Sequence, residues 1–200
     1  MTYNSFKEKE ILEAARSRFA HYGYSKVTME EIASDVEMGK ASLYYYFPTK
    51  EELFKSVIKK EQDLFVEEIE NLLKQDFSAS EKLRSYVIKR LEYFQQLVNL
   101  GTLNLHSVLD IKSVFKELLK AFETQEIFLI QKIIEEGKIK GEFDSGVNEK
   151  TNCLFIHLLQ GLRLQTLRSI KGNRLENEHY ESIKEEMMLF VDIFSKGIKV

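Results

Sequence analysis

Helix-start signals recur along the first eighty residues of this chain. Four segments have a Ser or Thr followed three residues later by Glu, and they begin at Ser5, Thr28, Thr49 and Ser78. This is the capping-box spacing, in which the hydroxyl and the carboxylate satisfy backbone amides that a helix leaves unpaired at its start. One proline and nine glycines are too few for the turns of a many-stranded β fold. The sequence therefore predicts an all-α protein.

The spacing of apolar residues predicts where the helices lie. The first follows Ser5 and ends at Gly23, a residue type that is common just after a helix. A second, short helix follows Thr28, and a third runs from Lys40 to about Phe47. Further helices are expected over residues 50–75, 79–98, 102–110, 112–138, 148–171 and 178–197. The chain should thus have about nine helices.

The sequence predicts a cytoplasmic protein. No apolar run approaches the roughly 18 residues that a membrane-spanning helix needs. The first ten residues are charged and contain no signal-peptide core. The lone Cys153 cannot form a disulfide within the chain, which fits a reducing compartment.

The net charge of −3 does not by itself favour nucleic acid. Residues 1–60 carry ten Lys or Arg against nine Asp or Glu, whereas residues 61–200 carry 19 against 23. A finer asymmetry lies between Met38 and Lys50, a segment with two lysines and no acid. Such a patch can face phosphates while the rest of the molecule is acidic. On charge alone, a chance gap between acids explains it equally well.

Two short helices joined by a tight turn and braced by a longer helix have helix-turn-helix geometry. The second of them can enter the major groove of DNA. Pro48 stops this helix by disfavouring the helical conformation of Phe47, and Leu43, four residues earlier, should share the inward face with Phe47. The tyrosines at positions 44–46 suggest an aromatic core stripe as the alternative. Because they point about 100° apart, at least one must be displayed.

The run TMEEIASDVEMGKASLYYYFPTKEELF, residues 28–54, resembles the DNA-binding signature of the TetR family of transcriptional regulators. The pattern K-x-x-L-Y-x-Y-F-x-x-K-x-x-L is matched by Lys40, Leu43, Tyr44, Tyr46, Phe47, Lys50 and Leu53. The resemblance implies a helix-turn-helix domain over residues 1–48 and a helical ligand-binding and dimerisation domain over residues 49–200. It also implies which residues line the double-stranded DNA operator: Thr28, Met29, Gly39, Lys40, Ala41, Ser42, Tyr44, Tyr45, Tyr46 and Lys50.

The turn between the two short helices departs from the family pattern. Glu37 stands where the family usually has glycine, Gly39 replaces the usual capping Ser or Thr, and Ala41 replaces a glycine. A residue other than glycine at positive φ costs roughly 1 kcal/mol. We therefore expect backbone strain at Glu37.

In this family the last two helices usually pack against their copies as a four-helix bundle, so the resemblance implies a homodimer. Gly161 would permit close approach of the two chains. The interface residues that it implies are Leu154, Leu158, Gly161, Leu162, Gln165, Met187, Phe190, Val191 and Phe194. The alternative is that these apolar rows are buried within one chain.

The resemblance also implies a cavity for a small-molecule effector. The aromatic and polar residues that could line it are Phe65, Tyr86, Tyr93, Phe94, His106, Phe122, Gln125, Phe128 and His157. Plain core packing is the alternative for each. Because phenylalanine is abundant and charge is sparse among these positions, we expect a largely apolar effector that releases a repressor from its operator.

Two other classes of function stay open: a helical enzyme, and a helical scaffold that has a cavity but does not bind DNA. The sequence has no Gly-rich phosphate loop and no H-E-x-x-H, C-x-x-C or G-x-S-x-G motif. Cys153 and His157, four residues apart, could bind a metal or act as nucleophile and base, but a half-buried core pair explains them. A scaffold would not need two lysines beside displayed tyrosines. We expect no enzymatic activity, no cofactor and no metal.

Overall fold

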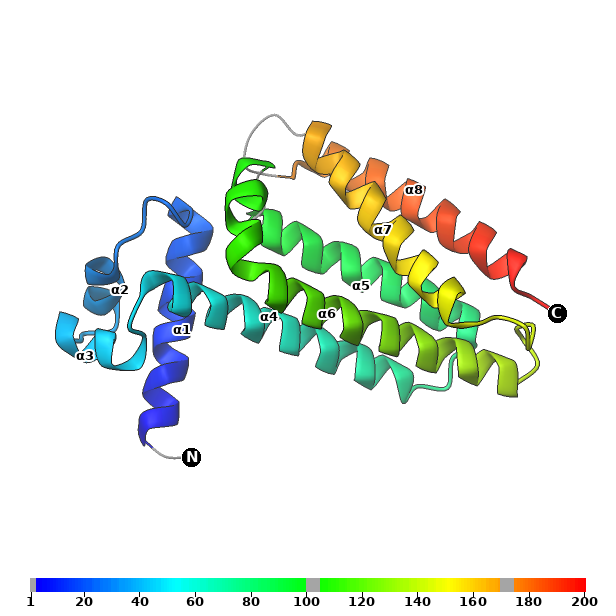
Figure 1. Ribbon diagram of the computed structural model, residues 1–200, viewed down its shortest axis with the longest axis horizontal. Coiled ribbons are helices and arrows are strands. Elements are labelled where there is room, and N and C mark those ends of the chain that lie inside the picture. The colour runs from blue at the N-terminus through cyan, green and yellow to red at the C-terminus, as the bar shows by residue number, and fades with distance from the viewer. Residues whose placement is uncertain (1–2, 100–104, 170–174) are drawn as a thin grey trace.

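The computed structural model describes residues 3–99, 105–169 and 175–200, and the side chains of residues 5–98, 117–168 and 175–200. These residues form eight helices, and the all-α prediction is confirmed (Figure 1). The bounds are α1 (Tyr3–Tyr22), α2 (Met29–Asp35), α3 (Lys40–Tyr46), α4 (Lys50–Leu73), α5 (Ala79–Asn99), α6 (Leu105–Ile139), α7 (Glu149–Ser169) and α8 (Asn177–Gly197). None of the described helices is both long and apolar enough to cross a membrane.

The prediction of about nine helices was wrong at one place. The segments 102–110 and 112–138 were expected as separate helices, but α6 is continuous from Leu105 to Ile139. Neither glycine nor proline occurs between Leu105 and Glu136, so nothing in the local sequence interrupts the backbone hydrogen bonds. The other predicted helices agree with the structure to within a few residues at each end.

The molecule has two hydrophobic cores, and the boundary between them lies along α4. The first core joins α1, α2 and α3 to the start of α4, where Leu53, Phe54, Val57 and Ile58 are buried. The second core begins on the same helix at Phe65 and extends through α5, α6, α7 and α8. Between the two cores, Glu61 and Gln62 are buried with exposed fractions of 6% and 2%. Helix α4 is therefore shared by both cores, with a polar layer between them.

The larger domain is a helical bundle into which α4 runs from the small N-terminal domain (Figure 1). Helix α5 contacts α4, α6 and α8, while α7 packs against α6 and α8. The small domain contacts the bundle chiefly through α1 on α4. There Arg16 donates from Nε to Oε1 of Glu61 at 2.8 Å, and Lys60 pairs with Glu13. These ion pairs tie the first helix to the polar layer of α4.

Candidate nucleic-acid interface

A capping box starts α2 and a Thr cap starts α4 as the sequence predicts, but α1 begins at Tyr3, so Ser5 lies inside that helix and does not start it. At the start of α2, the backbone amide of Glu31 donates to Oγ1 of Thr28 at 3.3 Å. In return, the backbone amide of Thr28 donates to the Glu31 carboxylate at 2.8 Å. At the start of α4, the amide of Glu52 donates to Oγ1 of Thr49 at 3.1 Å. Gly39 precedes α3 without a side-chain cap, so the start of α3 is fixed by the turn before it.

The turn between α2 and α3 holds Glu37 in the left-handed region, with φ of +52°. The strain expected from the missing glycine is therefore confirmed, at a cost of roughly 1 kcal/mol. Gly23, with φ of +80°, ends α1 and donates from its amide to the carbonyl of Phe19 at 2.9 Å. Glu37 is thus the one residue other than glycine at positive φ among the described residues, and it lies in the turn between α2 and α3.

Helix α3 buries one face and displays the other. Leu43 and Phe47 are buried in the first core, with exposed fractions of 0% and 5%. Tyr45 is 78% exposed, which confirms that the three tyrosines cannot all be buried. Tyr46 is half-buried. The remaining predicted residues of this segment are exposed: Gly39, Lys40, Ala41, Ser42 and Tyr44.

Lys40 lies on the displayed face of α3. Its ammonium pairs with Glu30 of α2 and lies 5.8 Å from the centre of the Tyr44 ring. The hydrogen bond to Glu30 raises the pKa of Lys40, so this side chain stays charged. Exposed ion pairs of this kind are weak. The ammonium of Lys40 can therefore exchange Glu30 for a phosphate.

Lys50 and Met29 differ from the expectation that they line DNA. The ammonium of Lys50 donates to the carbonyls of Tyr24 and Val27, both at 3.0 Å, and lies 4.5 Å from the centre of the Tyr24 ring. Two of its three N–H groups therefore brace the loop before α2. Met29 is 4% exposed and packs in the first core, because it occupies the inward face of the first turn of α2. Thr28, beside it, is exposed.

The predicted cavity residues divide into an inner and an outer group. Phe65, Tyr86, Tyr93, Phe94 and Phe122 are buried together in the second core. The rings of Phe65, Tyr93 and Phe122 surround the guanidinium of Arg90 at 5.2–5.8 Å.

Gln125, Phe128 and His157 are exposed, so the prediction that they line an internal cavity was wrong. They lie on the outward faces of α6 and α7, where Nε2 of His157 is 3.2 Å from Glu123. The side chain of His106 lies outside the described residues. Among those that are described, no group of three or more His, Cys, Asp or Glu is placed to hold a metal ion.

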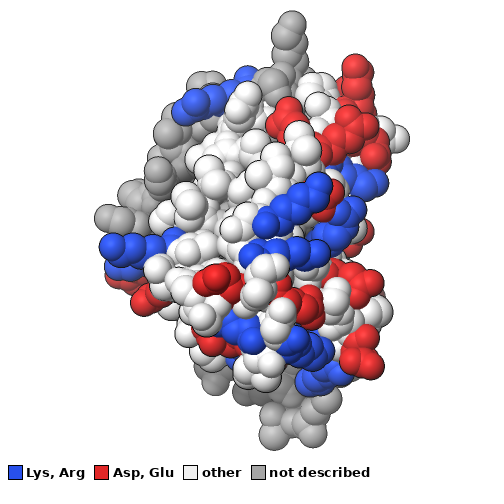
Figure 2. Space-filling model, turned by 90° about the vertical axis from the view of Figure 1, so that its right-hand side faces the viewer, with Lys and Arg blue, Asp and Glu red and all other residues white. Residues whose placement is uncertain are grey.

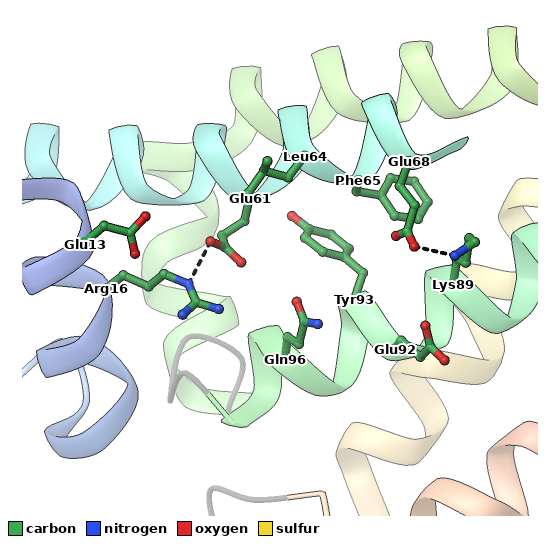
Figure 3. A pocket seen from close by; sticks show the side chains of 10 residues that line it. All are labelled: Glu13, Arg16, Glu61, Leu64, Phe65, Glu68, Lys89, Glu92, Tyr93 and Gln96. Atoms are coloured by element: carbon green, nitrogen blue, oxygen red, sulfur yellow. Dashed lines mark hydrogen bonds and ion pairs between the residues drawn. The ribbon is translucent and has the colours of Figure 1, made fainter. Parts of the chain in front are cut away.

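An open cleft separates α1 from the facing parts of α4 and α5 (Figure 3). It has a volume of about 350 Å³. The Arg16–Glu61 and Lys89–Glu68 ion pairs cross it, and Tyr93 and Phe65 form its inner wall. The cleft therefore lies where the small domain meets the bundle.

Helices α7 and α8 display apolar side chains that the chain itself does not cover. Of the predicted interface residues, Leu154, Leu158, Gly161 and Gln165 are exposed, and Leu162, Phe190 and Phe194 are half-buried. Met187 and Val191 are fully buried, so their assignment to an interface was wrong. They face α5 and α7 inside the bundle, and the sequence analysis missed their outward neighbours Leu189 and Ile193, which are 62% and 61% exposed.

The far end of the bundle offers no comparable surface for DNA. Figure 2 views the side opposite the small domain, where Lys and Arg are interspersed with Asp and Glu. On the described residues of this side, neither sign of charge forms a continuous patch. Lys and Arg side chains neutralise DNA phosphates, but on this side acids stand among them, whereas residues 38–50 contain two lysines and no acid. The displayed face of α3 is the better candidate.

Comparisons with known proteins agree with the fold and the interface. Residues 11–57 match the model of bacterial regulatory proteins of the tetR family, and residues 58–159 match that of the YsiA-like protein C-terminal region. A transcriptional regulator from Cytophaga hutchinsonii ATCC 33406, known from its crystal structure, is 40% identical with a TM-score of 0.88. That match covers 96% of this chain and 98% of the other.

Two curated relatives are regulators and not enzymes. The fatty acid metabolism regulator protein of Bacillus subtilis is 26% identical over 146 residues, which cover 71% of this chain and 73% of that protein. The HTH-type transcriptional repressor NicS of Pseudomonas putida is 30% identical over 138 residues, 66% of this chain and 64% of that protein. The chain belongs to the TetR family of DNA-binding transcriptional regulators.

Proposed function

We propose that the chain is a homodimeric repressor that reads an operator with α3 and leaves it when a small effector binds the bundle. The observation that carries this proposal is the displayed face of α3, where exposed Lys40, Ser42 and Tyr45 stand on a segment without acids. The hydroxyls suit phosphates and base edges. The curated repressor among the relatives supports repression rather than activation.

On this proposal, Lys40, Ser42, Tyr44 and Tyr45 contact the DNA directly. Thr28, Gly39, Ala41 and Tyr46 border that surface, where backbone and hydroxyl groups can meet phosphates. Lys50 holds the loop before α2 in place and is a positioning residue. Residues 1–48 form the DNA-binding domain and residues 49–200 the ligand-binding and dimerisation domain, with α4 serving both cores.

The two lysines should therefore behave differently. Lys40→Ala removes a cation that displaces counterions, so the salt slope of operator binding should fall by about one unit. Lys50→Ala loses two charge-assisted hydrogen bonds and should lower the stability of the small domain by roughly 2 kcal/mol, with the salt slope unchanged. Fluorescence anisotropy on DNA from beside the protein's own gene, at several salt concentrations, measures the slopes. Thermal unfolding measures the stability.

The reverse pattern would contradict these assignments. A reduced slope for Lys50→Ala with unchanged stability would return Lys50 to the phosphate contacts. Retained operator binding by a Lys40→Ala, Tyr45→Ala double variant, at wild-type affinity and slope, would remove α3 from the interface altogether.

The second copy of the chain is the proposed occupant of the apolar face on α7 and α8. Leu154 and Leu158 on α7 and Leu189 and Ile193 on α8 present branched apolar side chains to solvent. Exposed apolar area of this kind marks an interaction surface. A dimer would also place two recognition helices on half-sites about 34–36 Å apart, one turn of DNA. The family's usual dimer supports the same surface.

Release requires that the effector bind one arrangement of the two domains better than the other. Helix α4 serves both cores, and the Arg16–Glu61 pair ties it to α1. Motion of α4 would therefore reposition α3. Coupling of about 1–3 kcal/mol would weaken operator binding roughly 5–150-fold. By linkage, operator DNA must weaken effector binding by the same factor. Titration of a ligand with and without operator measures this, and equal affinities would refute release.

A further inference from the structure

Three charged side chains are buried at the centre of the bundle, one each from α5, α6 and α7. The exposed fractions are 8% for Arg90, 1% for Glu126 and 5% for Arg163. Arg90 donates from Nε and from Nη2 to the Glu126 carboxylate, the latter at 3.3 Å. Tyr86 donates its hydroxyl to Oε1 of Glu126 at 2.6 Å. The carboxylate of Glu126 is thus held by Arg90 and Tyr86.

Among the residues whose side chains the structure describes, this cluster has one positive charge in excess. Two guanidinium groups face a single carboxylate, and the surrounding rings of Phe65, Tyr93 and Phe122 carry no formal charge. Burying a charge without a partner is costly. Burial and the nearby Arg90 lower the pKa of Arg163 to about 10, so the guanidinium is less stable as a cation here than in water but is still charged at neutral pH. The excess charge lies at Arg163.

Two buried polar atoms beside this charge have no hydrogen-bond partner among the described residues. They are Nη1 of Arg163 and the hydroxyl of Tyr93. Arg90 lies between them in this charge network: its guanidinium is 5.2 Å from the centre of the Tyr93 ring, and its charge contributes to lowering the pKa of Arg163. Since more than nine in ten buried polar groups are satisfied in native proteins, two unsatisfied donors beside an excess cation indicate a missing acceptor.

We propose that this acceptor is the carboxylate of the effector, and that Arg163 and Tyr93 form an internal anion site. A monocarboxylate supplies the one negative charge that the cluster lacks, whereas a phosphate monoester would bring in excess charge. The apolar body of the ligand would lie against the rings of Phe65, Phe122 and Phe155. The inference rests on the proposed function and names its effector class: a monocarboxylate with an apolar body.

The site also adjoins the contact between the two domains. Tyr93 projects from α5 toward α4, between Glu61 and Phe65 (Figure 3). Burial raises the pKa of Tyr93, and the charge of Glu61 contributes to that rise. Glu61 in turn accepts from Arg16 of α1. A carboxylate that engages the Tyr93 hydroxyl therefore acts one side chain away from the ion pair that ties α1 to α4.

The test uses octanoate, decanoate and phenylacetate at up to millimolar concentration on the full chain, each beside the uncharged amide of the same skeleton. At least one carboxylate should raise the melting temperature and weaken operator binding, and its amide should do neither. Arg163→Gln and Tyr93→Phe should each weaken carboxylate binding at least tenfold. The matched control is Arg168→Gln, on the exposed end of the same helix, which should bind as the wild type does.

The outcomes separate this inference from the proposed function. Amides that bind as well as carboxylates, carboxylates that do not bind, or wild-type affinity in both variants would overturn the anion site, while operator binding would still uphold a repressor. Carboxylate binding that depends on Arg163 in a protein without operator binding would uphold the site and overturn the repressor. If Arg163→Gln does not fold, two other measurements test the anion site. They are the comparison of acid with amide in the wild type and carboxylate binding by the near-isosteric Tyr93→Phe variant.

Discussion

Replacing Leu158 and Leu189 by lysine is expected to give a folded monomer that binds its operator about 10²–10⁴-fold more weakly than the wild type. Leu158 and Leu189 are 44% and 62% exposed, so neither substitution opens a cavity in the core. In a dimer formed through α7 and α8, the two chains would bring four lysines into one interface. Their charges would repel one another, because the interface excludes water. In a dimer, once one recognition helix has bound its half-site, the other binds the second half-site as an intramolecular step. A monomer loses this gain in effective concentration, which raises the apparent affinity by about 10²–10⁴-fold.

Light scattering measures the oligomeric state and anisotropy the operator affinity of the same samples. The matched control is Leu64→Lys, because Leu64 is 52% exposed on α4, away from α7 and α8. This variant should stay dimeric. A double-lysine variant that remains a dimer with wild-type operator affinity would show that the chain associates through another surface.

The helices could be predicted because their signals are local. Capping boxes, the single proline and the terminal glycines act within one or two turns, and the structure follows them in the small domain except at Ser5, which lies inside α1. The same local rules failed at residue 111, where two separate helices were predicted although neither glycine nor proline interrupts the sequence. Strain at Glu37 was predictable because a family pattern fixes the backbone there.

Which face of a helix is buried could not be predicted where more than one face is apolar. On α8, Met187 and Val191 alternate with Leu189 and Ile193, and the sequence does not say which pair meets α5. Lys50 illustrates a second limit. Its position after the recognition helix suggests a phosphate contact, but its partners are carbonyls 23 and 26 residues earlier in the chain.

The buried charges of the bundle carried a signal that the sequence analysis missed. Arg90, Glu126 and Arg163 each lie four residues from buried apolar or aromatic residues on the same helix: Tyr86, Phe94, Phe122, Ile130, Leu159 and Leu167. A charged residue that interrupts a core stripe is rarely fully buried unless it is paired. The apolar neighbours therefore predict that these three charged residues are buried and paired. Which of them pair with each other depends on how the three helices pack.

The carboxylate of that cluster should be the most sensitive single group for stability. Glu126→Gln is expected to lower the free energy of unfolding by about 3–5 kcal/mol at neutral pH, because it leaves two buried guanidinium groups without a negative partner. The amide keeps the volume of the side chain, so the loss reports charge rather than packing. Urea unfolding followed by circular dichroism measures it.

The dependence of stability on pH follows from the direction in which the pKa of Glu126 is shifted. Burial alone would raise the pKa of Glu126, but Arg90 and Arg163, with the hydrogen bonds from Arg90 and Tyr86, outweigh burial and lower it below 4.5. The folded chain therefore holds this proton less tightly than the unfolded chain. The stabilisation is fully present above about pH 4.5 and is lost as the pH falls through the lower, folded-state pKa. The difference between wild type and Glu126→Gln should shrink over that acidic range.

Two companion variants separate the excess charge from a general loss of packing. Glu123→Gln, one turn earlier on α6 with a partly exposed carboxylate, should change stability by no more than about 0.5 kcal/mol. Arg163→Met removes the guanidinium that has no carboxylate of its own and should leave the ligand-free chain as stable as the wild type or more so. Combined with Glu126→Gln, it should recover part of the loss, since only Arg90 is then unpaired. A double variant as unstable as Glu126→Gln alone would show that Arg163 does not share that carboxylate, and the excess charge assigned to the cluster would be wrong.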